Sequence, residues 1–202
     1  MSLQPAGDNT LLRKELRARR RAVPPKMHAA CSRRAASHIT RLPQFASGRR
    51  IALTLSFDGE ADTAPLIAAA RKRGVRLFSP VIVDKRHRRL RFYRLTSTVR
   101  RGTYGIRVPR RLLQPLSPRW FDLVVVPLVG VDPKGRRLGM GGGYYDRAMA
   151  FRRLRHHWRG PRLVGFALDC QRAEPVQVQP WDLQLDDLAT ESGLHHYPEE
   201  KA

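Results

Sequence analysis

The sequence lacks the features of a membrane or secreted protein. No apolar run approaches the ~18 residues that a membrane-spanning helix needs, and the N-terminus has no apolar signal-peptide core. Cysteine is scarce: Cys31 and Cys170 are the only two, and they show neither a Cys-x-x-Cys motif nor zinc-ligand spacing. These absences argue against a disulfide-stabilised or zinc-binding domain. We expect a cytoplasmic protein that does not bind membranes and keeps both thiols reduced.

Acidic residues are also few. The chain has 17 aspartates and glutamates against 39 lysines and arginines, which gives a net charge of +22, and no acid lies between Asp84 and Asp122. Such a balance attracts nucleic acids and anionic substrates over a Debye length of roughly 8–10 Å. The charge is spread along the chain without a known nucleic-acid-binding motif, so we favour a solvated arginine-rich surface and expect no specific nucleic-acid partner. A basic nucleic-acid-binding protein remains the alternative.

The length of 202 residues fits a single domain over residues 1–202, with N-terminal helices at about 10–42 and an α/β core at about 50–192. Hydrophobic periodicity, with proline and glycine stops, predicts helices at 11–21, 26–42 and 64–73 and strands at 51–55, 75–83, 90–95, 122–127 and 163–168. The order strand, helix, strand favours parallel pairing. The predicted fold class is therefore α/β: an open, mostly parallel sheet flanked by helices, in a Rossmann-like three-layer single domain.

Two stretches lack a clear pattern. Residues 96–119 contain several glycines and prolines and are predicted to form a long surface loop, and residues 171–191 are predicted to be mostly irregular.

The strand at 122–127 is nearly continuous in β-branched residues, which predicts a central position in the sheet. Ligands of open α/β sheets bind beyond the carboxyl ends of the strands. We therefore expect the site among the loops that follow Leu55, Val83, Pro127 and Leu168.

The most informative stretch runs from Arg136 to Arg147 and reads Arg-Arg-Leu-Gly-Met-Gly-Gly-Gly-Tyr-Tyr-Asp-Arg. Its four glycines within five positions permit positive φ angles and a close approach of the backbone to a ligand. A predicted helix at 144–151 would direct its N-terminal N–H groups at an anion held by the loop. The spacing matches neither standard nucleotide-binding fingerprint. A mobile linker is the alternative, but the aromatic pair, carboxylate and cation that follow are not typical of linkers.

Three carboxylates are candidates for binding. Glu60 follows the first predicted strand, where a turn would place it at the carboxyl edge of the sheet. Asp146 follows the glycine loop and Asp182 lies far downstream, and two carboxylates beside a polyphosphate are a common way to hold Mg²⁺. Glu60 could instead be a carboxylate at the start of the next helix, and Asp146 and Asp182 could each be a structural cap or the ion-pair partner of an arginine. No Ser-His-Asp or Cys-His arrangement stands out, and the histidines show no metal-ligand spacing.

Together these segments resemble the 5-formyltetrahydrofolate cyclo-ligase family, also called methenyltetrahydrofolate synthetases. The most specific match is the glycine loop with its Tyr-Tyr-Asp continuation, and the resemblance covers roughly residues 10–192. Further matching segments, in the family's order, are residues 12–16, 53–63, 79–80, 131–135, 165–171, 181–186 and 190–191.

The resemblance implies a reaction in which ATP and Mg²⁺ convert 5-formyltetrahydrofolate to 5,10-methenyltetrahydrofolate, with release of ADP and phosphate, in a protein expected to be a monomer. Carried over by position, the implied ATP-binding residues are Arg13, Lys14, Arg137, Leu138, Gly139, Met140, Gly141, Gly142, Gly143, Tyr144 and Tyr145. The implied substrate-binding residues are Leu55, Glu60, Gly141, Gly142, Gly143 and Tyr144. The implied metal ligands are Asp146 and Asp182, and the implied catalytic residues are Arg137, Tyr145 and Asp146.

The chain departs from the family pattern at two positions. Asn9 stands where many members carry a lysine, and Met140 stands where arginine is common in the loop. Residues 9–13 would close over the nucleotide, so Asn9 removes one phosphate contact unless Lys14 or an arginine replaces it. A folate-binding relative without turnover is therefore a further alternative.

Overall fold

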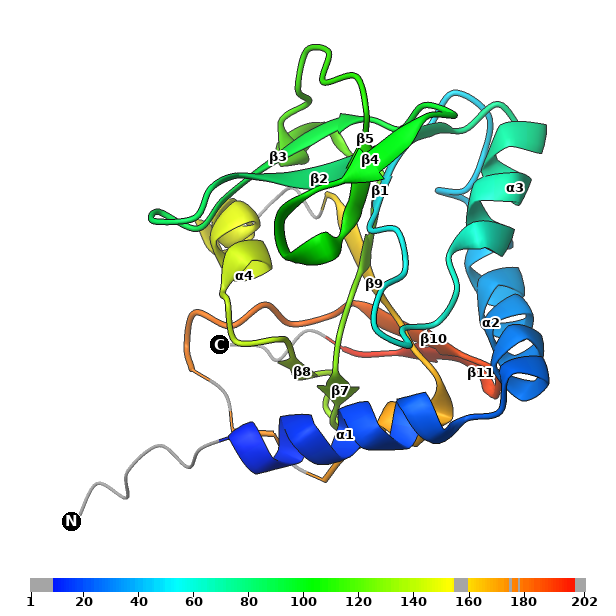
Figure 1. Ribbon diagram of the computed structural model, residues 1–202, viewed down its shortest axis with the longest axis vertical. Coiled ribbons are helices and arrows are strands. Elements are labelled where there is room, and N and C mark those ends of the chain that lie inside the picture. The colour runs from blue at the N-terminus through cyan, green and yellow to red at the C-terminus, as the bar shows by residue number, and fades with distance from the viewer. Residues whose placement is uncertain (1–8, 155–159, 175, 178, 199–202) are drawn as a thin grey trace.

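The computed structural model describes residues 9–154, 160–174, 176–177 and 179–198. Its centre is a seven-stranded sheet in the order β11-β10-β9-β6-β1-β2-β3. Figure 1 shows α2 and α3 on one face of this sheet and α4 on the other, with α1 running beneath β7 and β8. The helices are α1 (Thr10–Ala22), α2 (Pro25–Thr40), α3 (Ala64–Lys72) and α4 (Tyr144–Ala148).

The strands of the main sheet are β1 (Arg50–Leu53), β2 (Arg76–Asp84), β3 (Arg89–Arg94), β6 (Leu123–Val126), β9 (Arg162–Phe166), β10 (Asp187–Thr190) and β11 (Gly193–His196). The five inner strands pair in parallel, while β3 and β11 pair antiparallel at the two edges. The predicted mostly parallel sheet is confirmed. Two small antiparallel pairs complete the fold: β4 (Val99–Arg101) with β5 (Arg107–Pro109), and β7 (Gly130–Val131) with β8 (Arg137–Leu138).

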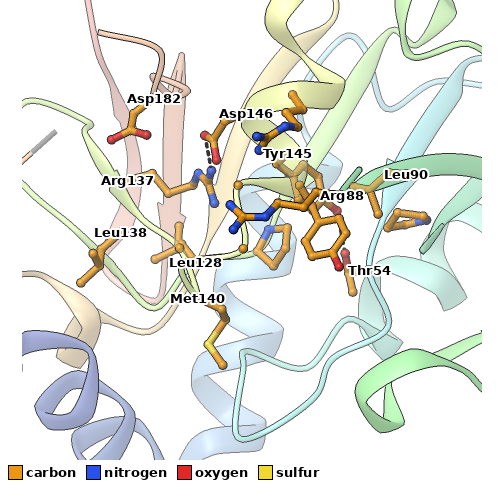
Figure 2. Close-up of a pocket in the computed structure, with 18 of the residues that line it drawn as sticks. Thr54, Arg88, Leu90, Leu128, Arg137, Leu138, Met140, Tyr145, Asp146 and Asp182 are labelled. Atoms are coloured by element: carbon orange, nitrogen blue, oxygen red, sulfur yellow. Dashed lines mark hydrogen bonds and ion pairs between the residues drawn. The ribbon is translucent and has the colours of Figure 1, made fainter. Parts of the chain in front are cut away.

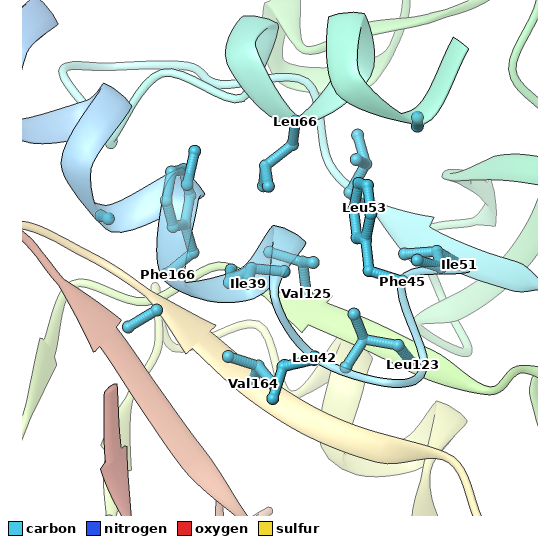
Figure 3. Close-up of a cluster of buried hydrophobic side chains, with 14 of the residues drawn as sticks. Ile39, Leu42, Phe45, Ile51, Leu53, Leu66, Leu123, Val125, Val164 and Phe166 are labelled. Carbon is cyan, nitrogen blue, oxygen red and sulfur yellow. The ribbon is translucent and has the colours of Figure 1, made fainter. Parts of the chain in front are cut away.

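The central strand β6 shows why its sequence is apolar throughout. Leu123 and Val125 pack into the core beneath α2 and α3, whereas Val124 and Val126 pack into the core on the opposite face, with α4. Side chains of a strand alternate between the two faces, so a strand buried on both needs no polar positions. Figure 3 shows the first of these cores, in which Ile39 and Leu66 lie among side chains of β1, β6 and β9 such as Leu53, Val125 and Val164.

The structure corrects three sequence predictions. The expected loop at 96–119 contains the β4–β5 hairpin, whose three-residue strands carry exposed arginines and so show little hydrophobic pattern. The expected irregular tail contains β10 and β11, and β10 was concealed by polar residues such as Asp187, which is fully buried in a pair with Arg162. The expected helix at 144–151 ends at Ala148 and gives way to a 3-10 helix, Ala150–Leu154.

No helix among the described residues is both long and apolar enough to cross a lipid bilayer.

Candidate functional site

A cavity of about 1070 Å³ opens beyond the carboxyl ends of β1 and β6. The first residues past these strands, Thr54 after β1 and Pro127 and Leu128 after β6, line it directly. The chain adds β2 and β3 on one side of β1 and then β6, β9, β10 and β11 on the other side. The direction in which strands are added therefore reverses at β1. Ligand sites of open α/β sheets lie at such switch points. The loops expected to form the site all contribute to it: Glu60 follows Leu55, Arg88 follows Val83, Leu128 follows Pro127 and Gln177 follows Leu168, and all four line the cavity.

The glycine loop forms one wall of this cavity. All five residues from Gly139 to Gly143 line it, and Gly141 and Gly143 adopt φ angles of +88° and +63°, a region that glycine enters without steric cost. The guanidinium Nε of Arg13 donates a hydrogen bond of 2.9 Å to the Gly139 carbonyl. Helix α1 therefore contacts the loop through Arg13, which lines the cavity and places a cation beside the loop backbone.

Arg137 and Asp146 form an ion pair inside the cavity, as the dashed line in Figure 2 marks. The Arg137 Nη2 donates to Asp146 Oδ1 at 2.7 Å, and the Leu183 N–H donates to the same oxygen at 3.0 Å. Burial raises the pKa of Asp146, but the Arg137 charge and these hydrogen bonds outweigh it and hold that pKa below its ordinary value. The Arg137 Nε is buried with no hydrogen-bond partner in the described part of the chain. The Arg137 guanidinium suits binding of a phosphate, whereas the ionised Asp146 carboxylate would approach phosphate oxygens only through a cation held between them.

Asp182 lies with this pair, and Figure 2 groups Asp182, Asp146 and Arg137 at one end of the cavity, with Thr54 and Leu90 toward the other. Asp182 Oδ2 accepts a hydrogen bond of 2.9 Å from the Gln179 N–H. Residues 9–154, 160–174, 176–177 and 179–198 contain no group of three or more His, Cys, Asp or Glu side chains placed to hold a metal. Two carboxylates fit Mg²⁺ when phosphate and water oxygens supply the remaining ligands, as is usual for this ion.

Tyr145 forms part of the cavity floor. Its side chain is buried, and its hydroxyl lies 2.7 Å from the Thr54 hydroxyl. Burial raises the pKa of Tyr145 far above its ordinary value, which the Thr54 hydrogen bond opposes only in part. The phenol therefore stays protonated near neutral pH, which favours a hydrogen-bonding role over proton transfer.

Glu60 reaches the cavity from the loop after β1, and its Oε2 accepts a hydrogen bond of 3.2 Å from the Phe57 N–H. Burial raises the pKa of Glu60 to about 7, although the nearby Arg20 charge and the Phe57 N–H act in the opposite direction. A carboxyl with this pKa changes its protonation state near neutral pH.

Two residues implied by the resemblance do not line this cavity. Leu55 is 6% exposed and belongs to the core, while its neighbour Thr54 faces the cavity. Lys14 is exposed, whereas Arg13 lines the cavity. The reason is helical spacing: residues 13 and 20 of α1 lie seven apart on one face, and residue 14 is turned roughly 100° away from them. The same spacing could have identified Arg20.

Arg20 is the main residue that the sequence alone did not indicate. Its side chain is fully buried, and it donates to Asp58 twice, through Nε to the carbonyl and through Nη2 to Oδ2, both at 3.0 Å. Its Nη1 donates to the Leu128 carbonyl at 3.3 Å. Arg17 and Arg21 also donate to the Asp58 carboxylate. Helix α1 is thereby fastened to the loop that carries Glu60 and to the loop after β6.

The comparisons with known proteins agree with this geometry. A family model described as the 5-formyltetrahydrofolate cyclo-ligase family matches residues 6–191. The 5-formyltetrahydrofolate cyclo-ligase of Escherichia coli K12 is 36% identical over 182 residues, covering 88% of this chain and 97% of that protein. The Haemophilus influenzae protein of the same name is 31% identical over 189 residues, covering 89% and 98%.

A solved structure has the same fold. The 5,10-methenyltetrahydrofolate synthetase of Aquifex aeolicus, determined by NMR, superposes with a TM-score of 0.76 at 26% identity, covering 96% of this chain and 95% of that one. The family model spans most of the chain, and the relatives match along nearly their whole length. The chain belongs to the 5-formyltetrahydrofolate cyclo-ligase family.

Proposed function

We propose that this protein converts 5-formyltetrahydrofolate to 5,10-methenyltetrahydrofolate in a reaction that consumes ATP and requires Mg²⁺. The observation that carries the proposal is the position of the glycine loop, the Arg137–Asp146 pair and Glu60 around one cavity, in a chain that belongs to the cyclo-ligase family. The cavity of about 1070 Å³ has room for two ligands together.

The chemistry explains why a phosphoryl donor is needed. The formyl carbon is a poor electrophile because amide resonance supplies it with electrons. Transfer of the terminal phosphoryl group of ATP to the formyl oxygen releases ADP and activates that carbon. The folate N10 then attacks it and loses its proton, and the former formyl oxygen departs as phosphate. Phosphoryl transfer asks a protein mainly for alignment and neutralisation of charge.

The residues of the cavity fit these tasks. Arg13 and Arg137 place two guanidinium groups beside the glycine loop, where they would neutralise phosphate oxygens as the loop N–H groups bind them. Asp146 and Asp182 would hold Mg²⁺, which would supply positive charge to the phosphates. Glu60 would accept hydrogen bonds from the polar edge of the pterin. Leu55 and Lys14 do not line the cavity, so they would support the residues that contact the ligands without touching the ligands themselves.

The direct test follows the absorbance of the methenyl product. Purified protein with 5-formyltetrahydrofolate, ATP and Mg²⁺ is expected to form it continuously, and omission of ATP or removal of Mg²⁺ with EDTA is expected to stop its formation, because the activating step needs both. Addition of excess Mg²⁺ after EDTA should restore the rate. Folate binding without turnover would contradict the proposal and select the inactive relative that Asn9 and Met140 suggest.

A second prediction concerns the stability of the protein. The raised pKa of Glu60 means that, between about pH 4.5 and pH 7, the folded protein keeps a proton that the unfolded chain has lost. The contribution of Glu60 to stability is therefore complete below pH 4.5 and is lost as the pH rises through 7. Glu60→Gln cannot ionise, so its melting temperature relative to the wild type is expected to be higher at pH 8 than at pH 4. Thermal unfolding followed by circular dichroism measures this difference.

Exposed Glu15 on α1 provides the matched control, because Glu15→Gln should shift the melting temperature equally at both pH values. A pH-independent effect of Glu60→Gln would contradict the assignment. In the enzyme assay, the wild-type protein is expected to show a higher KM for the folate below pH 7. The reason is that protonated Glu60 accepts fewer hydrogen bonds than the carboxylate does.

The composition leads to further predictions that experiments in solution can test. Nucleic-acid binding rests on the net charge of +22 alone. A salt titration tests it: a steep loss of affinity with a persistent sequence or structure preference would support nucleic-acid binding, whereas weak binding without any preference would not. The predictions of a single-domain, cytoplasmic monomer also remain predictions, and size-exclusion chromatography would test the last of these.

A further inference from the structure

Three residues other than glycine have a left-handed backbone in the described ranges, and all three line the same cavity. They are Asp58, Arg88 and Tyr104, with φ angles of +56°, +52° and +57°. This conformation is unfavourable for residues with a Cβ, and it persists where the surrounding structure holds it, often at ligand-binding sites. Asp58 is explained by its three arginine partners. Tyr104 needs a different explanation.

Tyr104 lies at the turn of the β4–β5 hairpin, in the 3-10 helix Thr103–Gly105. Its side chain is 63% exposed, so burial in the core does not account for a large aromatic residue at this position. A glycine would adopt the same backbone without strain, as the next residue, Gly105, does at φ +75°. The sequence therefore places a bulky ring at a strained position without gaining hydrophobic burial there.

Other aromatic side chains border the cavity around Tyr104. Phe57 is 41% exposed, and its ring lies 3.7 Å from the position that a Cβ on Gly105 would take. A hydrogen bond with Tyr104 raises the pKa of the Tyr144 phenol, which places that side chain next to Tyr104. Figure 1 shows the β4–β5 connection reaching toward α4, which begins at Tyr144. Three elements thus bring aromatic rings to one edge of the cavity.

A cation completes this edge. The Lys85 ammonium group lies 5.7 Å from the centroid of the Tyr104 ring, within the range of a cation–π contact. Lys85 and Tyr144 both contact the Tyr104 side chain, whose exposed surface is not used for packing in the core. An exposed ring that is held in place beside a cavity is suited to stack on a flat ligand.

We propose that Tyr104 is a substrate-binding residue whose ring covers an aromatic ring of the folate, at the edge of the cavity bordered by Phe57 and Tyr144. The inference rests on the proposed function, because that function supplies a ligand with two flat ring systems, the pterin and the p-aminobenzoyl group. Neither residues 139–143 of the glycine loop nor Glu60 has an aromatic side chain that could stack on one of these rings.

The test measures binding of 5-formyltetrahydrofolate by isothermal titration calorimetry without ATP, together with steady-state kinetics and thermal unfolding. Tyr104→Ala and Tyr104→Gly are expected to raise the Kd for the folate about tenfold, the effect of removing one stacked ring. Tyr104→Phe keeps the ring and should stay within about twofold of the wild type. Tyr104→Gly relieves the backbone strain and should melt at or above the wild-type temperature. The KM for ATP should not change.

Leu113→Ala is the matched control, since Leu113 is 60% exposed in the same basic segment and does not line the cavity. Wild-type affinity for the folate in both Tyr104→Ala and Tyr104→Gly would overturn the inference, as would a Tyr104→Gly protein that melts lower and loses affinity for both substrates. If the wild type binds the folate without turnover, the proposed function fails while the Kd values still decide the role of Tyr104. Absence of folate binding by the wild type would overturn both.

Discussion

Replacing Asp146 with asparagine is expected to lower kcat by at least about a hundredfold, the usual scale when a transition-state electrostatic contact is removed. Asparagine keeps the shape of the side chain and can still accept the Leu183 hydrogen bond, but it carries no charge. The Arg137 guanidinium, whose side chain is only 7% exposed, would then lack its ionic partner. The proposed Mg²⁺ site would also lose one of its two carboxylates. Steady-state turnover with saturating ATP, folate and Mg²⁺ measures the effect.

Asp186→Asn is a matched control, because Asp186 pairs with Arg152 at 2.8 Å and does not line the cavity. Both variants remove one carboxylate charge from a partly buried ion pair. The Asp186 variant is expected to keep a kcat near that of the wild type, even where its melting temperature falls. If Asp146→Asn retained more than a tenth of the wild-type kcat, the proposed role of Asp146 would be wrong.

Asp58→Ala is expected to lower the free energy of unfolding by about 3 kcal/mol, because removal of one partner leaves the other charge buried without compensation. The Arg20 side chain has no solvent exposure, and among the described residues Asp58 is the only carboxylate that forms an ion pair with it. The expected value is at the lower end of the range for buried pairs, since Arg17 and Arg21 are partly exposed and can regain water. Burial raises the pKa of Asp58, but the hydrogen bonds from Arg21 and Arg17 outweigh this effect and hold the pKa below its ordinary value. The carboxylate is therefore ionised at neutral pH.

Urea unfolding measures this change, and Glu15→Ala provides the comparison on the same helix. Glu15 pairs with Arg19 one turn away, and both side chains are at least half exposed. Exposed pairs of this kind contribute little, so the change should stay within about 0.5 kcal/mol. Equal effects of Asp58→Ala and Glu15→Ala would show that the Asp58 cluster is no more than a surface ion pair. The loop that carries Glu60 should also loosen in Asp58→Ala, which would raise the KM for the folate.

The parts of the fold that could be predicted are those whose sequence pattern reports burial directly. The run at 122–127 predicted a central strand because β6 is apolar on both faces, and Gly74 marked the end of α3, where it adopts a φ of +68°. The β4–β5 hairpin and β10 escaped prediction because their residues are exposed arginines or a buried, paired aspartate. In those strands the polarity of a side chain does not show whether it is buried, because an ion-pair partner such as Arg162 allows Asp187 to be buried.

The same distinction applies to the site. The glycine loop could be found because its backbone conformation requires glycine at Gly141 and Gly143. Arg20 and Tyr104 are harder to find, since a basic residue in a chain of +22 and one tyrosine among five carry no signal of their own. Arg20 was recognisable only from its place one helical repeat after Arg13. Tyr104 becomes notable only through its φ angle and its neighbours.

The contacts of α1 have a consequence for the synthesis of the protein. The Asn9 side chain donates to the Gln177 carbonyl across 168 positions of the sequence, and Arg13 donates to the Gly139 carbonyl across 126. Translation proceeds from the N-terminus, so α1 leaves the ribosome early, whereas Gly139 and Gln177 are synthesised much later. The proposed ATP-binding wall is therefore complete only when nearly the whole polypeptide has been translated. Nascent fragments that end before the glycine loop should have no capacity to sequester ATP or folate.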